Sequence, residues 1–237
     1  MSQISPKRSL PDVGVIVPSG GRGERAGDGP PKQFRAIAGV PMLLRSLEAF
    51  LAFDEVREIV VPLPEDYLDQ PPAWLAAVLS DRVHTVKGGA TRAASVHNGF
   101  LALSPSRNII LIHDAARPFV NRDTVWRIIE KVAAGLSAIA ATPVRDTLKR
   151  SGEEGVILET VDRTGLWQAQ TPQGFPRDVL ARSYGDMMRS KDTLHATDEA
   201  SLVEQAGYAV HLVEDSTTNF KVTTREDFAL ANAIARE

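Results

Sequence analysis

Short runs of consecutive apolar residues alternate with longer amphipathic stretches over the first 141 residues of the chain. Because the runs lack polar alternation, they are typical of strands that are covered on both faces of a parallel sheet. The expected strands are Val13–Val17, Ile59–Val61, Val83–Val86, Asn108–Ile112 and Ala138–Ala141. The stretches between them predict helices over Pro41–Phe53, Pro72–Leu79, Thr91–Leu103 and Asp123–Ala134. Strands that alternate with helices predict an α/β fold with a doubly wound, mostly parallel sheet.

The alternation stops after Ala141, where two extended runs flank a polar Ser-Gly-Glu-Glu-Gly turn. These runs, Val144–Lys149 and Val156–Val161, predict a hairpin that is too long to be a plain connector. We therefore expect a protruding β-arm over about 142–171. Later patterns predict helices at Pro176–Met188, Asp198–Ala206 and Arg225–Ala235 and a strand at Ala209–Val213.

No linker or repeat divides this pattern, so residues 13–237 are expected to form one domain behind a flexible tail at 1–12. The chain has no cysteine, which excludes disulfides, thiolate nucleophiles and cysteine-based metal sites and fits a cytoplasmic location. The net charge of −3 disfavours a nucleic-acid partner. No segment reaches the roughly 18 apolar residues of a membrane span.

A glycine-rich loop, Ser19-Gly20-Gly21-Arg22-Gly23-Glu24-Arg25, follows the first predicted strand directly. Glycines let the backbone turn tightly and point amides at an anion, and arginines add charge. The spacing matches a dinucleotide fingerprint, but Gly27-Asp28-Gly29-Pro30-Pro31 cannot continue the helix that such a fingerprint opens. Two interpretations of this segment remain: a surface turn after the first strand, and a phosphate-binding loop that ends at Lys32.

Three further segments carry candidate chemistry. Asp114 follows a buried strand, where an acid can meet a metal or a sugar hydroxyl, although a turn or helix cap explains it equally well. His113 still lies in the strand pattern and fits a structural histidine better than a ligand. Gly89 and Ser95 lie on either side of a predicted helix start, which Thr91 would cap. Lys221 interrupts an extended run before the last predicted helix. Several cations and one acid at one sheet edge suit phosphoryl or nucleotidyl transfer.

The combined motifs resemble the 2-C-methyl-D-erythritol 4-phosphate cytidylyltransferases. The matching segments are Ser-Gly-Gly-Arg-Gly-Glu-Arg with Pro-Lys-Gln, Gly-Gly-x-x-Arg-x-x-Ser, His-Asp-Ala-Ala-Arg-Pro, Pro-Val-Arg-Asp-Thr, Val-Asp-Arg-x-x-Leu-Trp-x-x-Gln-Thr-Pro-Gln, Thr-Asp-Glu-Ala-Ser and Phe-Lys-Val-Thr. They occur in order from about Val13 to the last helix. The chain departs from the family pattern at Ser19-Gly20, where Ala-Ala is usual, and at Ala90, where an acid is common.

The resemblance implies a Rossmann-like sheet of the nucleotide-diphospho-sugar transferase type. It also implies transfer of CMP from CTP to methylerythritol phosphate, with release of pyrophosphate. The implied catalytic residues are Arg25, Lys32 and Lys221. The implied CTP-binding residues are Ser19, Gly20, Gly21, Gly23, Gly89, Ser95 and Asp114. The implied acceptor-binding residues are Asp114, Ala115, Arg117, Thr147, Arg163 and Thr171.

Thr147 and Arg163 fall on the arm, which in this family reaches across a homodimer. A Mg²⁺ or other divalent ion would be held mainly by CTP oxygens, with Asp114 as the one candidate protein ligand. Two alternatives stay open: a cytidylyltransferase for ribitol 5-phosphate or another polyol phosphate, and a nucleotide-binding protein that has kept the fold without the chemistry.

Overall fold

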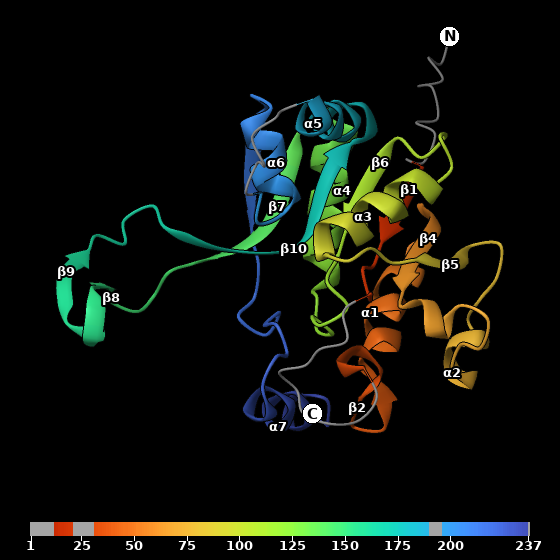
Figure 1. Cartoon of the computed structure of the whole chain (residues 1–237), viewed down its shortest axis with the longest axis horizontal. Coiled ribbons are helices and arrows are strands. Elements are labelled where there is room, and N and C mark those ends of the chain that lie inside the picture. The colour runs from red at the N-terminus through yellow and green to blue at the C-terminus, as the bar shows by residue number, and fades with distance from the viewer. Residues whose placement is uncertain (1–11, 21–30, 190–195, 237) are drawn as a thin grey trace, which may run out of the picture.

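The predicted apolar runs form six strands of a seven-stranded sheet in a computed structural model (Figure 1), which describes residues 12–20, 31–189 and 196–236; the seventh strand is β10 (Trp167–Pro176). The strand order is β11-β7-β10-β6-β1-β4-β5. The strands are β1 (Val13–Ile16), β4 (Val56–Leu63), β5 (Val83–Lys87), β6 (Ile109–Ile112), β7 (Ser137–Pro143), β10 (Trp167–Pro176) and β11 (Val210–Glu214). All neighbouring pairs are parallel except those of β10, which runs antiparallel to β6 and β7. The predicted doubly wound, mostly parallel sheet is confirmed.

Helices cover both faces of the sheet, because alternate strand residues point to opposite sides. Val15 and Leu111 pack with the apolar residues of α1 (Met42–Leu51) and α4 (Arg122–Ala133) in one core cluster. Ile16 and Ile112 pack on the other face in a second cluster. That face is covered by α3 (Arg92–Ala102), α5 (Arg177–Arg189) and α6 (Glu199–Gln205). The sheet is thus buried on both sides, as the unalternated apolar runs predict.

Smaller elements complete the chain outside the main sheet. A third apolar cluster packs α7 (Arg225–Ile234) against the short hairpin of β2 (Ala36–Ile37) and β3 (Val40–Pro41). The remaining short helices are η2 (Lys32–Phe34), η3 (Glu65–Tyr67), α2 (Ala73–Ala76) and η4 (Glu153–Gly155). The helix predicted over Pro72–Leu79 is therefore only the four residues of α2.

A protruding arm leaves the sheet between β7 and β10 (Figure 1). Its outer part is a two-stranded hairpin of β8 (Leu148–Ser151) and β9 (Ile157–Val161). The predicted end of the arm near residue 171 is wrong, because β10 already belongs to the main sheet from Trp167 onward. The hydropathy pattern hides this strand, since its buried residues include Gln170, Thr171 and Gln173. These polar side chains are hydrogen-bonded inside the fold rather than solvated.

Candidate active site

Backbone hydrogen bonds bring the segments after the parallel strands together at one edge of the sheet. The Ser19 amide donates to the Pro62 carbonyl at 2.9 Å, and the Gly88 amide donates to the Leu63 carbonyl at 2.7 Å. Gln33, in η2, donates its side-chain amide to the Ser19 carbonyl at 2.5 Å. The end of β1 and the start of η2 are therefore joined at the carboxyl edge, where ligands of α/β sheets bind.

Glycine at position 20 allows the loop after β1 to approach the start of α3. A Cβ on Gly20 would lie 2.9 Å from the Ser95 hydroxyl oxygen and 3.4 Å from the Gly88 Cα. Ser95 accepts a hydrogen bond from the Gly89 amide at 3.0 Å and donates to the Thr91 carbonyl at 2.9 Å. Thr91 caps α3 by accepting from the Ala94 amide at 3.1 Å, so the predicted cap is confirmed. The glycine at position 20, where alanine is usual in the family pattern, thus lies in close contact with Ser95.

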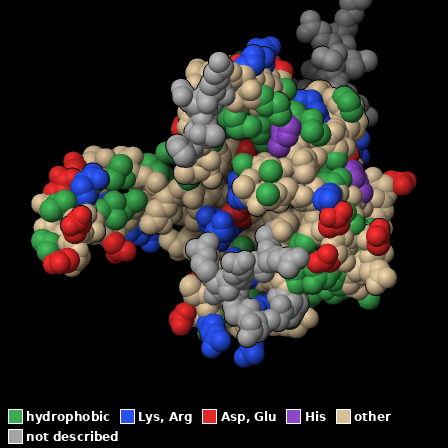
Figure 2. Space-filling view, in the orientation of Figure 1, with side chains coloured by type: hydrophobic (Ala, Val, Ile, Leu, Met, Phe, Trp, Pro, Cys, Tyr) green, Lys and Arg blue, Asp and Glu red, His purple; other side chains and the backbone are tan. Residues whose placement is uncertain are grey.

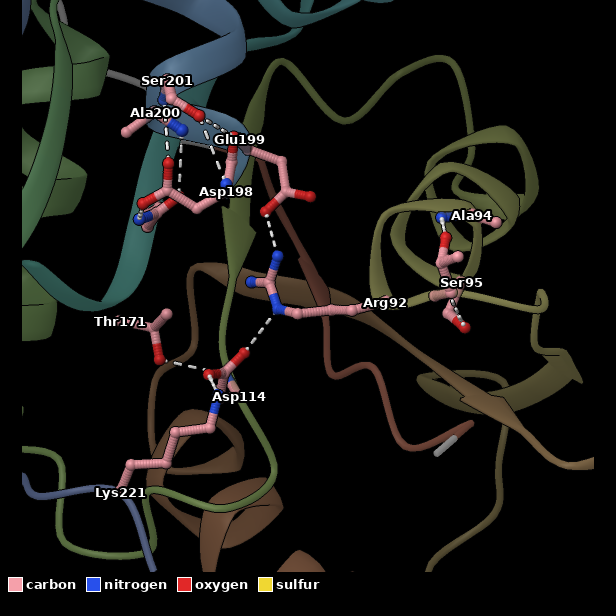
Figure 3. A network of polar contacts seen from close by, with 12 residues as sticks. Arg92, Ala94, Ser95, Asp114, Thr171, Asp198, Glu199, Ala200, Ser201 and Lys221 are labelled. Atoms are coloured by element: carbon pink, nitrogen blue, oxygen red, sulfur yellow. Dashed lines mark hydrogen bonds and ion pairs between the residues drawn. The ribbon is translucent and has the colours of Figure 1, made fainter. Parts of the chain in front are cut away.

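Asp114 lies between two cations at the end of β6 (Figure 3). Its Oδ1 accepts from the Arg92 Nε at 2.9 Å, and its Oδ2 accepts from the Lys221 Nζ at 2.7 Å. The carboxylate is therefore committed to ion pairs, which excludes the alternative that it is only a cap. Lys221 is also not simply solvated, although its side chain is 44% exposed.

Glu199 completes this network from the other side. Its Oε2 accepts from the Arg92 Nη1 at 2.8 Å, and its side chain is almost completely buried. Gln173 of β10 fixes the start of α6 by donating to Asp198 at 2.8 Å and accepting from the Ala200 amide at 3.1 Å. Arg92 therefore bridges two carboxylates that approach it from β6 and α6, as Figure 3 shows.

Burial and neighbouring charges shift the pKa values of Asp114, Arg92 and Glu199. Burial alone would raise the pKa of Asp114, but Arg92 and Lys221 outweigh it and hold that pKa well below its usual range. Burial likewise opposes the charge of Arg92, yet Asp114 and Glu199 raise its pKa above the ordinary value. For Glu199, burial dominates the attraction of Arg92 and raises the pKa. Asp114 is thus the carboxylate of this network that stays ionised at neutral pH.

The segment that carries Lys221 is anchored beside Asp114. The Val222 amide donates to the Ala116 carbonyl at 2.8 Å, and the Arg117 Nη1 donates to the Asn219 carbonyl at 2.7 Å. The buried Asn219 side chain donates to the Thr171 carbonyl at 2.8 Å and to Asp215 at 2.7 Å. Arg117, predicted to bind the acceptor, therefore also holds the backbone beside Lys221.

His113 is fully buried, with one ring nitrogen 3.1 Å from the Thr171 hydroxyl and the other 2.9 Å from the Arg117 carbonyl oxygen. The interpretation of His113 as a hydrogen-bonded structural histidine is confirmed. Burial lowers the pKa of its imidazole from 6.5 to about 4, against the smaller effects of the Arg117 carbonyl and Asp114.

This shift predicts a specific loss of stability in acid. Between pH 6.5 and pH 4 the unfolded state binds the proton that folded His113 refuses, so the free energy of unfolding falls as the pH falls through this window. From pH 7 to pH 5 the decrease due to His113 should be roughly 2 kcal/mol, at 1.36 kcal/mol per pH unit. Urea unfolding of the wild type and His113→Phe at both pH values measures it, and the variant should show the shallower pH dependence. An equal change in the free energy of unfolding with pH in both proteins would contradict the assignment. Glu199, whose raised pKa acts in the opposite direction, is present in both proteins and cannot cause a difference between them.

The other predicted site residues fall into three groups. Gly21, Gly23 and Arg25 lie outside the described residues, and of the glycine-rich loop the structure describes only Ser19 and Gly20. Lys32 begins η2 next to Gln33, and Ala115 is buried with its carbonyl accepting from Ser46 at 3.1 Å. Thr147 and Arg163 are exposed on the arm, which Figure 1 shows directed away from the sheet edge.

Sequence reasoning gave no role to Arg92 or Glu199, although both lie in motifs that carry the family resemblance. Arg92 is the arginine of Gly-Gly-x-x-Arg-x-x-Ser, and Glu199 is the glutamate of Thr-Asp-Glu-Ala-Ser. The motifs were therefore a usable signal, but 107 residues separate this pair, and neither position alone suggests its partner.

The site presents backbone amides, hydroxyl groups and cationic side chains to an anionic ligand. In residues 12–20, 31–189 and 196–236, no group of three or more His, Cys, Asp or Glu side chains is arranged to hold a metal ion.

Among the helices described, none is long and apolar enough to cross a membrane.

Comparison with known proteins connects this geometry with one activity. The family model of 2-C-methyl-D-erythritol 4-phosphate cytidylyltransferase matches residues 13–237. A curated relative of that name from Pseudomonas aeruginosa is 40% identical over 225 residues, covering 92% of this chain and 94% of its own. A solved structure of that name from Thermus thermophilus superposes with a TM-score of 0.78 at 34% identity, covering 96% of this chain and 100% of the other.

A third relative, from Desulfotalea psychrophila, is named as a bifunctional enzyme. It is 38% identical over 223 residues, which are 94% of this chain but 56% of the relative, so the chain spans little more than half of that protein. The family match runs from the first strand of the sheet through the arm to the last helix. By sequence and by fold, the chain belongs to the 2-C-methyl-D-erythritol 4-phosphate cytidylyltransferase family.

Proposed function

We propose that the chain transfers a cytidylyl group from CTP to 2-C-methyl-D-erythritol 4-phosphate, the reaction for which its family is named, in isoprenoid precursor biosynthesis. A phosphate oxygen of the acceptor attacks the α-phosphorus of CTP, the new P–O bond forms, and the bond to the β-phosphate breaks to release pyrophosphate. The attacking phosphate is already ionised, so the reaction needs no general base. Catalysis then depends on alignment and on cations that bind the transition state more tightly than the ground state.

The pairing of Asp114 with both Arg92 and Lys221 is the observation that carries this proposal. It holds Lys221 beside the expected acceptor position, where its charge can stabilise the phosphorane-like transition state. A carboxylate has about four acceptor positions, so Asp114 can still accept from hydroxyls of the acceptor while both cations stay bound. Lys32 and Arg25 complete the proposed set of cations on the triphosphate side.

CTP is proposed to lie along the loop from Ser19 and the segment from Gly88 to Ser95. The close approach of Gly20 to Gly88 supports this site, since a Cβ on residue 20 would lie 3.4 Å from the Gly88 Cα, so the two segments meet there. The hydrogen bond from the Gly89 amide to the Ser95 hydroxyl holds the second segment in place beside the first.

A divalent ion is proposed to arrive with CTP, coordinated by phosphate oxygens. Both oxygens of Asp114 already accept from cationic side chains, so the described residues do not form a ready metal site. The absence of cysteine from the sequence supports the proposed cytoplasmic location.

We further propose a homodimer in which the arm of one subunit completes the site of the other. The arm exposes a contiguous apolar run, Val156, Ile157 and Leu158, each at least 60% exposed, and Figure 2 shows such hydrophobic side chains along it. Contiguous exposed apolar residues mark interaction surfaces in soluble proteins. Thr147 and Arg163, which flank the hairpin of β8 and β9, would then reach the acceptor phosphate of the neighbouring subunit.

Replacing Arg163 by alanine should raise the KM for the acceptor by roughly 10- to 100-fold, because a hydrogen bond to a charged group contributes about 1.5–3 kcal/mol. The KM for CTP should change much less. Steady-state kinetics with each substrate varied in turn measures both constants. Arg150→Ala is the matched control, since Arg150 lies on the same arm but pairs with Glu159 at 2.5 Å. Equal changes in both KM values would contradict the assigned role.

Mixing the Arg163→Ala protein with a Lys32→Ala protein tests whether the arm crosses the interface. In a mixed dimer, one site combines an intact Lys32 with an intact partner arm, so activity should return although each parent is impaired. Co-expression with two affinity tags isolates the mixed dimer. A mixed dimer no more active than its parents would exclude the shared site.

The acceptor itself is tested by pyrophosphate release from CTP with methylerythritol phosphate or with ribitol 5-phosphate. The first acceptor should be turned over faster. Equal or better turnover of ribitol 5-phosphate would favour the polyol phosphate alternative, and no release with either acceptor would favour a binding protein without the chemistry.

A further inference from the structure

Two buried side chains next to the proposed site, His113 and Thr171, are linked in a chain of hydrogen bonds. The Thr171 hydroxyl oxygen lies 3.0 Å from the Asp114 amide nitrogen and 3.1 Å from the His113 Nδ1. The His113 Nε2 lies 2.9 Å from the Arg117 carbonyl oxygen. Thr171 is 4% exposed and His113 is not exposed at all, so water does not compete for these contacts.

The two ends of this chain decide its polarity. The Asp114 backbone amide can only donate, so the Thr171 hydroxyl oxygen must accept from it. The Arg117 carbonyl can only accept, so the His113 Nε2 must carry a proton and donate. A neutral ring then has a bare Nδ1, and the Thr171 hydroxyl donates its own hydrogen there. All the donors and acceptors of the chain are satisfied with the imidazole in the Nε2–H tautomer.

The same chain closes the turn that follows β6. The Arg117 amide donates to the Asp114 carbonyl at 2.9 Å, and the ring of His113 ties the Arg117 carbonyl back to the end of the strand. Within that turn the Ala116 carbonyl accepts from the Val222 amide, directly after Lys221. The ring also packs edge-to-face against Phe50, with ring centroids 5.0 Å apart.

We propose that His113 and Thr171 are positioning residues, which orient Asp114, and through the turn Lys221, by a hydrogen-bond chain of fixed polarity with the imidazole in its Nε2–H form. This inference rests on the proposed roles of Asp114 and Lys221 in the reaction. With its hydrogen committed to His113 and one lone pair to the Asp114 amide, the Thr171 hydroxyl orients Asp114 and can still accept a hydrogen bond from a hydroxyl of the acceptor. The ring contributes through the hydrogen bonds of both nitrogens as well as through its volume.

Thr171→Val and Thr171→Ser separate the hydroxyl from the shape of the side chain. Valine keeps the branched volume but removes the hydroxyl, and we expect kcat/KM for the acceptor to fall roughly 10- to 100-fold, as for a buried donor or acceptor left without a partner. Serine keeps the hydroxyl and should recover most of that loss, to within about threefold of the wild type. Thermal unfolding of both variants reports whether either change acts through stability instead.

Nitrogen-15 NMR of the imidazoles provides a readout that a packing role would not move. The chain has five histidines, and the His113 signals are those absent from His113→Phe. Near neutral pH and without substrates, Nε2 should resonate as a protonated nitrogen and Nδ1 as an unprotonated, hydrogen-bonded one. The Nδ1 signal should shift toward that of a free imine nitrogen in Thr171→Val and stay in place in Thr171→Ser.

Three results would overturn the proposal: a proton on Nδ1 of His113 in the folded protein, wild-type kcat/KM in Thr171→Val, or equal losses in the serine and valine variants. The tautomer is measured without substrates and on the unmodified protein, so it tests the chain even if the valine variant fails to fold. Failure of the proposed function would appear separately, as no pyrophosphate release by the wild type.

Discussion

Lys221→Ala should lower kcat by roughly 10²- to 10³-fold, the usual effect of removing one preorganised group that stabilises developing charge. Lys221 is held 2.7 Å from Asp114, so its ammonium group is positioned before substrates bind and needs no reorganisation in the transition state. Its side chain is 44% exposed, so the loss of its packing should change the fold little. Pyrophosphate release under saturating CTP and acceptor measures the effect.

Lys131→Ala is the matched control for this prediction. Lys131 lies in the last turn of α4, just before the start of β7, and thus at the sheet edge opposite the proposed site. The Lys131→Ala protein should turn over CTP and the acceptor at the wild-type rate. A Lys221→Ala protein that turns over within about threefold of the wild type, with an unchanged unfolding midpoint, would remove Lys221 from the reaction.

Asp114→Asn should both inactivate the protein and destabilise it. The change keeps the shape of the side chain but leaves Lys221 without a carboxylate and Arg92 with only Glu199, so we expect a loss in kcat/KM of at least the size predicted for Lys221→Ala. The free energy of unfolding should fall by about 1–3 kcal/mol, less than for a fully orphaned buried charge, because Arg92 keeps one partner and Lys221 can reach water.

The pH dependence of this stability difference has a definite sign. The folded-state pKa of Asp114 lies below that of the unfolded chain, so its contribution is present above about pH 4 and is lost as the pH falls through the folded-state pKa. Wild type and Asp114→Asn should therefore converge in acid. Asp186→Asn, at an exposed pair with Arg189, is the control and should cost at most about 1 kcal/mol. Equal stability of the wild type and Asp114→Asn at pH 7 would contradict the ion-pair network.

The strand β6 could be predicted because its residues are uniformly apolar, whereas only the apolar centre of β4, Ile59–Val61, was predicted, since the charged Arg57 and Glu58 lie near the start of that strand. The strand β10 could not be predicted, because three of its buried residues are polar and are stabilised by partners such as Asp114, Asp198 and Asn219 that are distant in the sequence. A polar strand of this kind is recognised only when its hydrogen-bond partners are known. The predicted arm was consequently too long at its second end.

The candidate site, like the fold, could be predicted only in part from the sequence. Asp114, Lys221 and the Gly89–Ser95 segment stand out because each follows a strand or opens a helix at the expected edge. Their pairing was not predictable, and Glu199 gained a role only through Arg92. His113 was correctly separated from ligands, yet its connection to Thr171 depends on β10 lying beside β6.

The sequence by itself determined the fold class, the absence of thiol chemistry and the kinds of groups available to an anionic substrate, since these follow from local periodicity and residue type. The tertiary structure alone decided which charges meet. Asp114 lies 22 residues from Arg92 and 107 residues from Lys221, and the two ion pairs form because the strand order of the sheet brings their segments together. Local sequence encodes backbone preference, whereas a buried ion pair depends on distance and desolvation, which exist only after the chain has folded.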